Sequence, residues 1–130
     1  MAQGAIRRKQ WFSLRRLNAA ERALYCRLSG GPPPGCLIVR WPWWWRGFRG
    51  LALAQLVLVR DDSDSELIMH ELTHVAQFRA APLRFWWRYL RALRREGYAA
   101  NPYEREADAF ARRARAILAE ERNRANRERG

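Results

Sequence analysis

The two histidines of this chain, the only ones in its 130 residues, stand four positions apart in the segment His70-Glu71-Leu72-Thr73-His74. Side chains at positions i and i+4 meet on one side of an α-helix, roughly 6 Å apart. The run Asp61-Asp-Ser-Asp64 precedes the segment and supplies candidate N-cap residues. We therefore predict a helix over about residues 65–79, and the rest of the fold has to pack around it.

The length and composition of the chain indicate one folded domain. Apolar residues make up 48% of it, which is too many for an intrinsically disordered chain. The longest apolar run, residues 51–59, contains Gln55 and has less than half of the roughly 20 residues that span a membrane. The first 17 residues hold no apolar stretch of signal-peptide length, so we expect a cytoplasmic protein.

Local signals divide the chain further. Asn18 and Glu21 have the spacing of a capping box at the start of a helix, and residues 29–35, rich in Gly and Pro, end that helix. Residues 36–41 and 48–60 are predicted strands, joined by a Trp-rich loop over 42–47 in what would be a hairpin. The remaining predictions are a basic tail over 1–17, one domain over 18–120, helices over 83–96 and from 102 to about 120, and a charged tail over 121–130. The fold class is therefore α+β, with a small antiparallel sheet packed on the helix that carries the histidines and with further helices beside it.

The H-E-x-x-H arrangement predicts one catalytic zinc ion. His70 and His74 can take two adjacent corners of a zinc tetrahedron, while Glu71 points aside and can accept a proton from a water molecule that zinc activates. A catalytic zinc has three protein ligands and one open position. The chain has no third histidine and no suitably spaced cysteine, so the third ligand should be a carboxylate.

Two carboxylates compete for this position on the last predicted helix. Glu104 and Glu106 flank opposite edges of its apolar stripe, and the spacing alone does not choose between them. Glu104 could also complete a capping box with Asn101. From the residues alone, the identity of the third ligand stays open.

The pairing of H-E-L-T-H with the downstream pattern E-x-x-x-D over residues 104–108 resembles the gluzincin clan of zinc metallopeptidases, which includes thermolysin and neprilysin. The resemblance implies that Glu104 is the third zinc ligand and that Asp108 hydrogen-bonds His70 and orients it. It also implies that Glu71 is the general base in hydrolysis of a peptide or protein substrate. The domain would then be a minimal zincin-like fold.

The same resemblance also makes predictions about how the substrate would bind. It implies that an edge strand within residues 51–60 pairs with an extended peptide substrate. The chain departs from the larger members of the clan because it has no further histidine to stabilise an oxyanion. Tyr98, Tyr103 or an arginine would have to serve instead.

A net charge of +12 and two aromatic clusters interleaved with arginines suggest an additional binding surface. The clusters could pack in the core, or they could lie on an anionic membrane with tryptophan at the level of the lipid headgroups. Nucleic-acid binding is less favoured because no recognised motif accompanies them. The alternative function is therefore a basic, aromatic-rich module that binds membranes or nucleic acid and has a structural or vestigial zinc site. The clusters comprise Trp41, Trp43, Trp44, Trp45 and Phe48, and then Phe85, Trp86, Trp87 and Tyr89.

Overall fold

The computed structural model of the chain describes residues 13–40 and 49–130. The predicted Trp-rich loop over 42–47 and most of the predicted basic tail lie outside these residues. The described part contains four helices and four strands. In chain order they are β1 (Ser13–Arg15), α1 (Ala19–Ser29), β2 (Leu37–Arg40), β3 (Gly50–Leu53), β4 (Leu56–Val59), α2 (Ser65–Ala80), α3 (Phe85–Ala100) and α4 (Pro102–Arg129).

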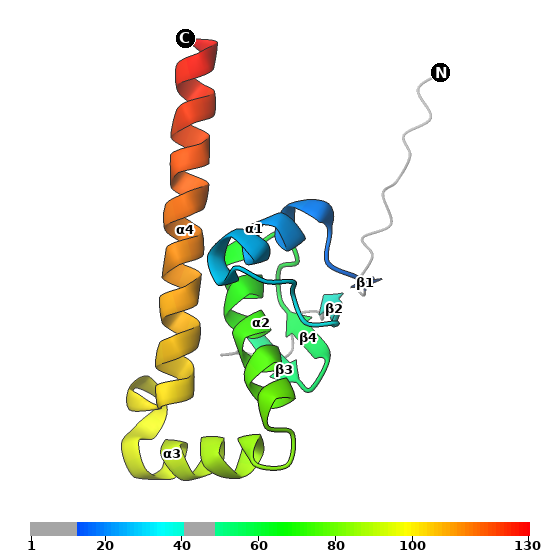
Figure 1. The fold of residues 1–130 in the computed structure, drawn as a ribbon, viewed down its shortest axis with the longest axis vertical. Helices are drawn as coiled ribbons and strands as arrows, with labels where there is room; N and C mark the ends of the chain where they lie inside the picture. The colour runs from blue at the N-terminus through cyan, green and yellow to red at the C-terminus, as the bar shows by residue number, and fades with distance from the viewer. Residues whose placement is uncertain (1–12, 41–48) are drawn as a thin grey trace, which may run out of the picture.

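Helix α2, which carries the H-E-x-x-H segment, lies between the sheet and the long helix α4 (Figure 1). Helix α1 packs against α4, and α3 runs across the opposite end of the molecule. The final turns of α4 project beyond the rest of the fold (Figure 1). This arrangement gives α2 one face toward the sheet and another toward α4.

The sheet is mixed and has the strand order β1-β2-β4-β3. Pairs β1–β2 and β3–β4 are antiparallel, whereas β2–β4 is parallel, so the prediction of an antiparallel sheet is wrong for the central pair. The reason is that residues 48–60 do not form one strand. The chain turns back at Ala54 and Gln55, with Ala54 at φ 53°, and the hairpin is β3–β4 instead of the predicted pairing across 42–47.

The predicted helices are present, with different ends. Asn18 and Glu21 form the predicted capping box of α1, and Asp64 caps α2 by accepting from the backbone N–H of Leu67 at 3.0 Å. Gly97, at φ 76°, interrupts the last turns of α3 where we expected that helix to close. Helix α4 continues to Arg129, past residue 120, where we expected it to fray.

The described end of the predicted N-terminal tail belongs to the sheet, because β1 pairs with β2. Arg15 on this strand holds the loop that precedes α2. Its guanidinium donates to both carboxylate oxygens of Glu21 and to the carbonyl of Asp62 at 2.6 Å. Glu21 is 3% exposed and Arg15 is 27% exposed, so this ion pair is partly shielded from water. It joins β1, the start of α1 and the loop before α2.

The core fixes how α2 is rotated about its axis. Ile68, Leu72 and Val75 are buried at helical spacing and belong to the same apolar cluster as Ile38 and Val57 of the sheet. Residues 70, 74 and 77 lie on the other side of α2, toward α4. Burial of the apolar stripe therefore determines where the two histidines point.

None of the helices in the described ranges is both long enough and apolar enough to cross a membrane.

Candidate metal centre

The two imidazoles of α2 converge on one carboxylate of α4. The Nε2 atoms of His70 and His74 each lie 3.2 Å from an oxygen of Glu104, and the two ring centroids are 5.0 Å apart. One nitrogen from each histidine and one oxygen of Glu104 all lie within 4.8 Å of one another. The pattern on two separate helices thus produces a single cluster of three candidate ligands.

The other ring nitrogen of each histidine faces a hydrogen-bond acceptor. Nδ1 of His70 lies 3.1 Å from Oδ1 of Asp108, and Nδ1 of His74 lies 2.8 Å from Oε1 of Gln77. A neutral imidazole carries one N–H and one lone pair. If both imidazoles are neutral and donate Nδ1–H to these acceptors, both Nε2 lone pairs face Glu104.

This geometry requires positive charge at the centre of the cluster, because lone pairs on nitrogen would otherwise face an acceptor-only carboxylate. Oε2 of Glu104 is buried and has no hydrogen-bond partner among the described residues. The pKa of His74 is shifted in the direction that favours its positively charged form. Burial lowers this pKa, but the hydrogen bond and charge of Glu104 outweigh burial and raise it. Two imidazoles and one carboxylate form a ligand set that could hold a divalent metal ion.

The position of Glu104 follows from the way α4 begins. Asn101 is fully buried, and its side chain accepts from the backbone N–H of Tyr103 at 3.0 Å. The backbone N–H of Asn101 is donated to the carbonyl of Tyr98, so Glu104 does not complete a capping box and turns into the cluster. There it accepts from the hydroxyl of Tyr89 at 2.6 Å.

The surroundings of Glu104 keep it ionised. Burial raises its pKa, but the imidazoles of His70 and His74 and the hydroxyl of Tyr89 outweigh burial and hold the pKa well below the usual value. Glu106, the other candidate, is exposed and lies outside the cluster, where it accepts from Nε2 of Gln77 at 3.3 Å. The structure therefore brings Glu104, and not Glu106, to the two histidines.

Glu71 lies next to the cluster and on a different side of α2. It is only 4% exposed, and burial raises its pKa to about 7, against the opposing charges of His74 and His70. A carboxyl group with a pKa near neutrality can both accept and release a proton. Gly50 of β3 makes room for it, since a Cβ at that position would lie 2.9 Å from Oε1 of Glu71.

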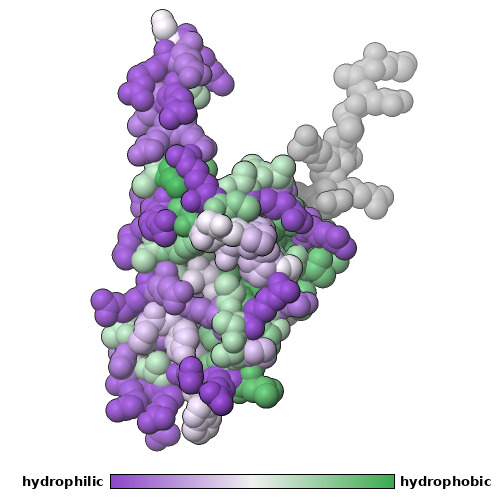
Figure 2. Space-filling view, in the orientation of Figure 1, coloured by the Kyte–Doolittle hydropathy of each residue, from purple (hydrophilic) through white to green (hydrophobic). Residues whose placement is uncertain are grey.

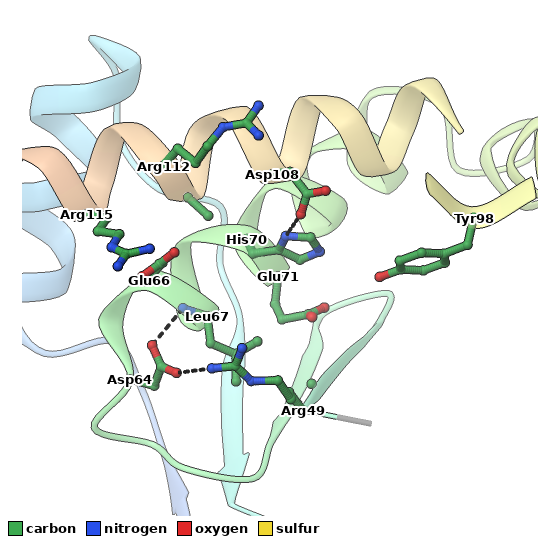
Figure 3. A pocket seen from close by; sticks show the side chains of 12 residues that line it. Arg49, Asp64, Glu66, Leu67, His70, Glu71, Tyr98, Asp108, Arg112 and Arg115 are labelled. Carbon is green, nitrogen blue, oxygen red and sulfur yellow. Dashed lines mark hydrogen bonds and ion pairs between the residues drawn. The ribbon is translucent and has the colours of Figure 1, made fainter. Parts of the chain in front are cut away.

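An open cleft of about 890 Å³ gives access to His70 and Glu71. Tyr98 points its hydroxyl toward these two residues from the end of α3 (Figure 3). Tyr103, the other predicted tyrosine, does not line this cleft and packs its ring 5.5 Å from that of Phe85. The walls come from β3, the start of α2, the end of α3 and the middle of α4, and include Arg49, Asp64, Glu66, Leu67, Asp108, Ala111, Arg112 and Arg115.

Sequence reasoning missed three residues of this site. Gln77 and Tyr89 contact the candidate ligands, and Gly50 leaves space beside Glu71. Gln77 had a usable signal, because it follows His74 by three positions and His70 by seven and so shares their helix face. Tyr89 and Gly50 had none, since their contacts depend on how α3 and β3 pack.

Comparison of the chain with protein-family models, with curated proteins and with solved structures finds no match. The description of the site therefore depends on its residues and their geometry.

The geometry predicts that the acceptors behind the histidines control metal affinity. Replacing Asp108 with Ala should weaken zinc binding about 10–100-fold, because His70 would lose the partner that fixes its ring and tautomer. Asp108→Asn keeps an acceptor oxygen and should retain most of the affinity. Competition with a chromophoric chelator measures both variants.

Glu128→Ala, at the exposed far end of α4, is the control and should bind zinc like the wild type. Unchanged affinity in Asp108→Ala would contradict the positioning role of this carboxylate.

Proposed function

We propose that this chain is a zinc-dependent metallopeptidase. The observation that carries the proposal is the position of Glu71, a buried carboxylate that lines the same cleft as His70, one of the three candidate ligands. His70, His74 and Glu104 would hold the ion and leave a coordination position for water or substrate. A buried carboxylate beside such a position is the requirement for general-base hydrolysis.

The chemistry divides between the ion and the chain. When bound, zinc would polarise a substrate carbonyl and lower the pKa of a water molecule. Glu71 would take a proton from the attacking water as the new C–O bond forms, and would return it to the amide nitrogen as the C–N bond breaks. The products are one carboxylate and one protonated amine, which together contain the atoms of the amide and one water molecule, so the step consumes only water. Its buried position beside His70 suits Glu71 to both transfers.

The gluzincin resemblance remains a prediction, and the geometry is compatible with it residue by residue. Glu104 lies at the candidate ligand position and Asp108 behind His70. Strand β3 is the edge strand next to β4 in the described sheet, and its first residue, Gly50, lines the cleft. An extended peptide could pair with this edge of the described sheet through main-chain hydrogen bonds, with its scissile bond near Glu71.

Tyr98 is our candidate for stabilising the oxyanion. Its hydroxyl points into the cleft beside Glu71 (Figure 3). Burial, together with the charge of Glu104, raises the pKa of Tyr98, so the hydroxyl stays protonated and can donate a hydrogen bond. A donor fixed close to the reacting carbonyl favours the transition state over the substrate.

The alternative is a binding module whose zinc is structural. A structural zinc site is normally closed by four protein ligands, often including cysteine. Among the described residues the cluster holds three candidate ligands, and neither Cys26 nor Cys36 belongs to it. A module of this kind would also have no use for Glu71 in an open cleft. These points favour the hydrolase.

Cleavage of a mixed peptide library tests the proposal directly. The zinc-loaded wild type should release new amino termini, and Glu71→Gln should lower the rate about 10²–10⁴-fold through loss of the general base. Zinc content should stay the same in this variant, because Glu71 is not a ligand. Tight zinc binding without any cleavage by the wild type would favour the binding module instead.

Replacement of Gly50 gives a second test of the role of Glu71, because it fills the space beside this carboxylate. In Gly50→Ala the new methyl group would push the carboxylate of Glu71 aside, and misplacement of a catalytic group by 1 Å can cost about 10²-fold in rate. We expect kcat to fall while zinc affinity stays at the wild-type value.

Gly35→Ala is the matched control, because a Cβ there meets no atom within 4 Å. Equal activity of Gly50→Ala and Gly35→Ala would contradict the assignment of Glu71 as the base.

A further inference from the structure

Helix α3 presents large apolar side chains to solvent. Leu83, just before the helix, is 97% exposed, Trp87 is 72% exposed and Leu90 is 56% exposed, with Trp86 at 36% beside them. We call these four residues the α3 patch. Single exposed apolar residues are common, but several of them clustered on one helix indicate an interaction site.

The residues of α3 separate into three faces. Phe85 is buried against the fold, and Tyr89 on the same side reaches Glu104. At a helical turn of 3.6 residues, the α3 patch occupies the next face. A third face carries the arginines, which are Arg84, Arg88, Arg91 and Arg95, while Arg94 lies near the end of the apolar face.

The arginines of α3 form no ion pair with an acidic residue in the described part of the chain. In residues 13–40 and 49–130, the ion pairs of the protein do not include any of these five side chains. Figure 2 shows strongly hydrophilic residues interrupted by pale and apolar ones over the end of the molecule that α3 forms. An apolar face bordered by arginines complements a partner that has an apolar interior and a negatively charged outer layer.

We propose that α3 binds the surface of an anionic lipid bilayer. Trp86 and Trp87 would lie at the level of the headgroups, Leu83 and Leu90 would enter the boundary of the acyl chains, and the arginines would contact lipid phosphates. The two leucines favour lipid over nucleic acid, because phosphate contact and base stacking use arginines and aromatic rings but not aliphatic side chains.

Helix α3 carries the exposed patch on one side and residues of the candidate site on the other. Tyr89 on the inner side of α3 donates to Glu104, and Tyr98 at the end of α3 lines the cleft. A helix is about 10 Å thick. A bilayer bound to the outer side would therefore lie about one helix diameter from the cluster.

Co-sedimentation with vesicles tests the proposal. The full chain should bind phosphatidylcholine vesicles that contain roughly one third phosphatidylglycerol, and bind phosphatidylcholine alone much more weakly. Trp87→Ser with Leu90→Ser should lower the partition coefficient at least about tenfold. Arg88→Gln with Arg91→Gln should lower it roughly fivefold for each arginine and reduce its dependence on salt.

Matched variants elsewhere control for exposure and charge. Leu14→Ser changes a leucine of β1 that is 55% exposed, and Arg124→Gln with Arg127→Gln removes the same charge from the exposed end of α4. Both should leave binding close to the wild-type value. Thermal melting of each protein checks that the fold is intact.

Three results would overturn the proposal. One is absence of binding to the anionic vesicles, and another is an equal loss of binding in the control variants. The third is a different occupant of the α3 patch, seen either as a dimer that Trp87→Ser with Leu90→Ser dissociates or as nucleic-acid binding without vesicle binding.

Discussion

The contact between α2 and α4 is the interaction on which the candidate site depends, because each helix supplies only part of the cluster. Small buried residues of α4 let the two helices approach closely, namely Ala107, Ala111 and Ala114. Glu104 precedes them on the same face at helical spacing, so the packing that buries the alanines also brings its carboxylate to His70 and His74. A bulkier side chain in this stripe would separate the ligands as well as the helices.

Much of the site was readable because helical spacing translates directly into geometry. The four-residue separation of His70 and His74 predicted that they share a face of α2, and the capping residues before them predicted where that helix begins; the structure agrees with both. The choice of Glu104 over Glu106 required the resemblance to a known clan, since spacing left both open. Geometry then gives a physical reason, because the N–H of Asn101 is already donated to Tyr98 and Glu104 is free to face the histidines.

The remainder depends on contacts between distant segments. No local signal marks the hairpin turn at Ala54 and Gln55, where Asn-Gly or Asp-Gly would be usual, and so the mixed sheet was predicted as antiparallel. The hydrogen bond from Tyr89 to Glu104 and the space that Gly50 leaves for Glu71 likewise join residues from separate elements. Periodicity reports which side of an element is apolar, but it does not report which element covers that side.

The central claim is that one zinc ion is held by two residues of α2 and one of α4. Equilibrium dialysis followed by elemental analysis tests it most directly, on the wild type and on Glu104→Gln and Glu106→Gln. The account predicts one zinc per chain in the wild type, loss of tight binding in Glu104→Gln, and near wild-type zinc content in Glu106→Gln. A wild type that binds no zinc, or a Glu104→Gln variant that binds it as tightly as the wild type, would contradict the account.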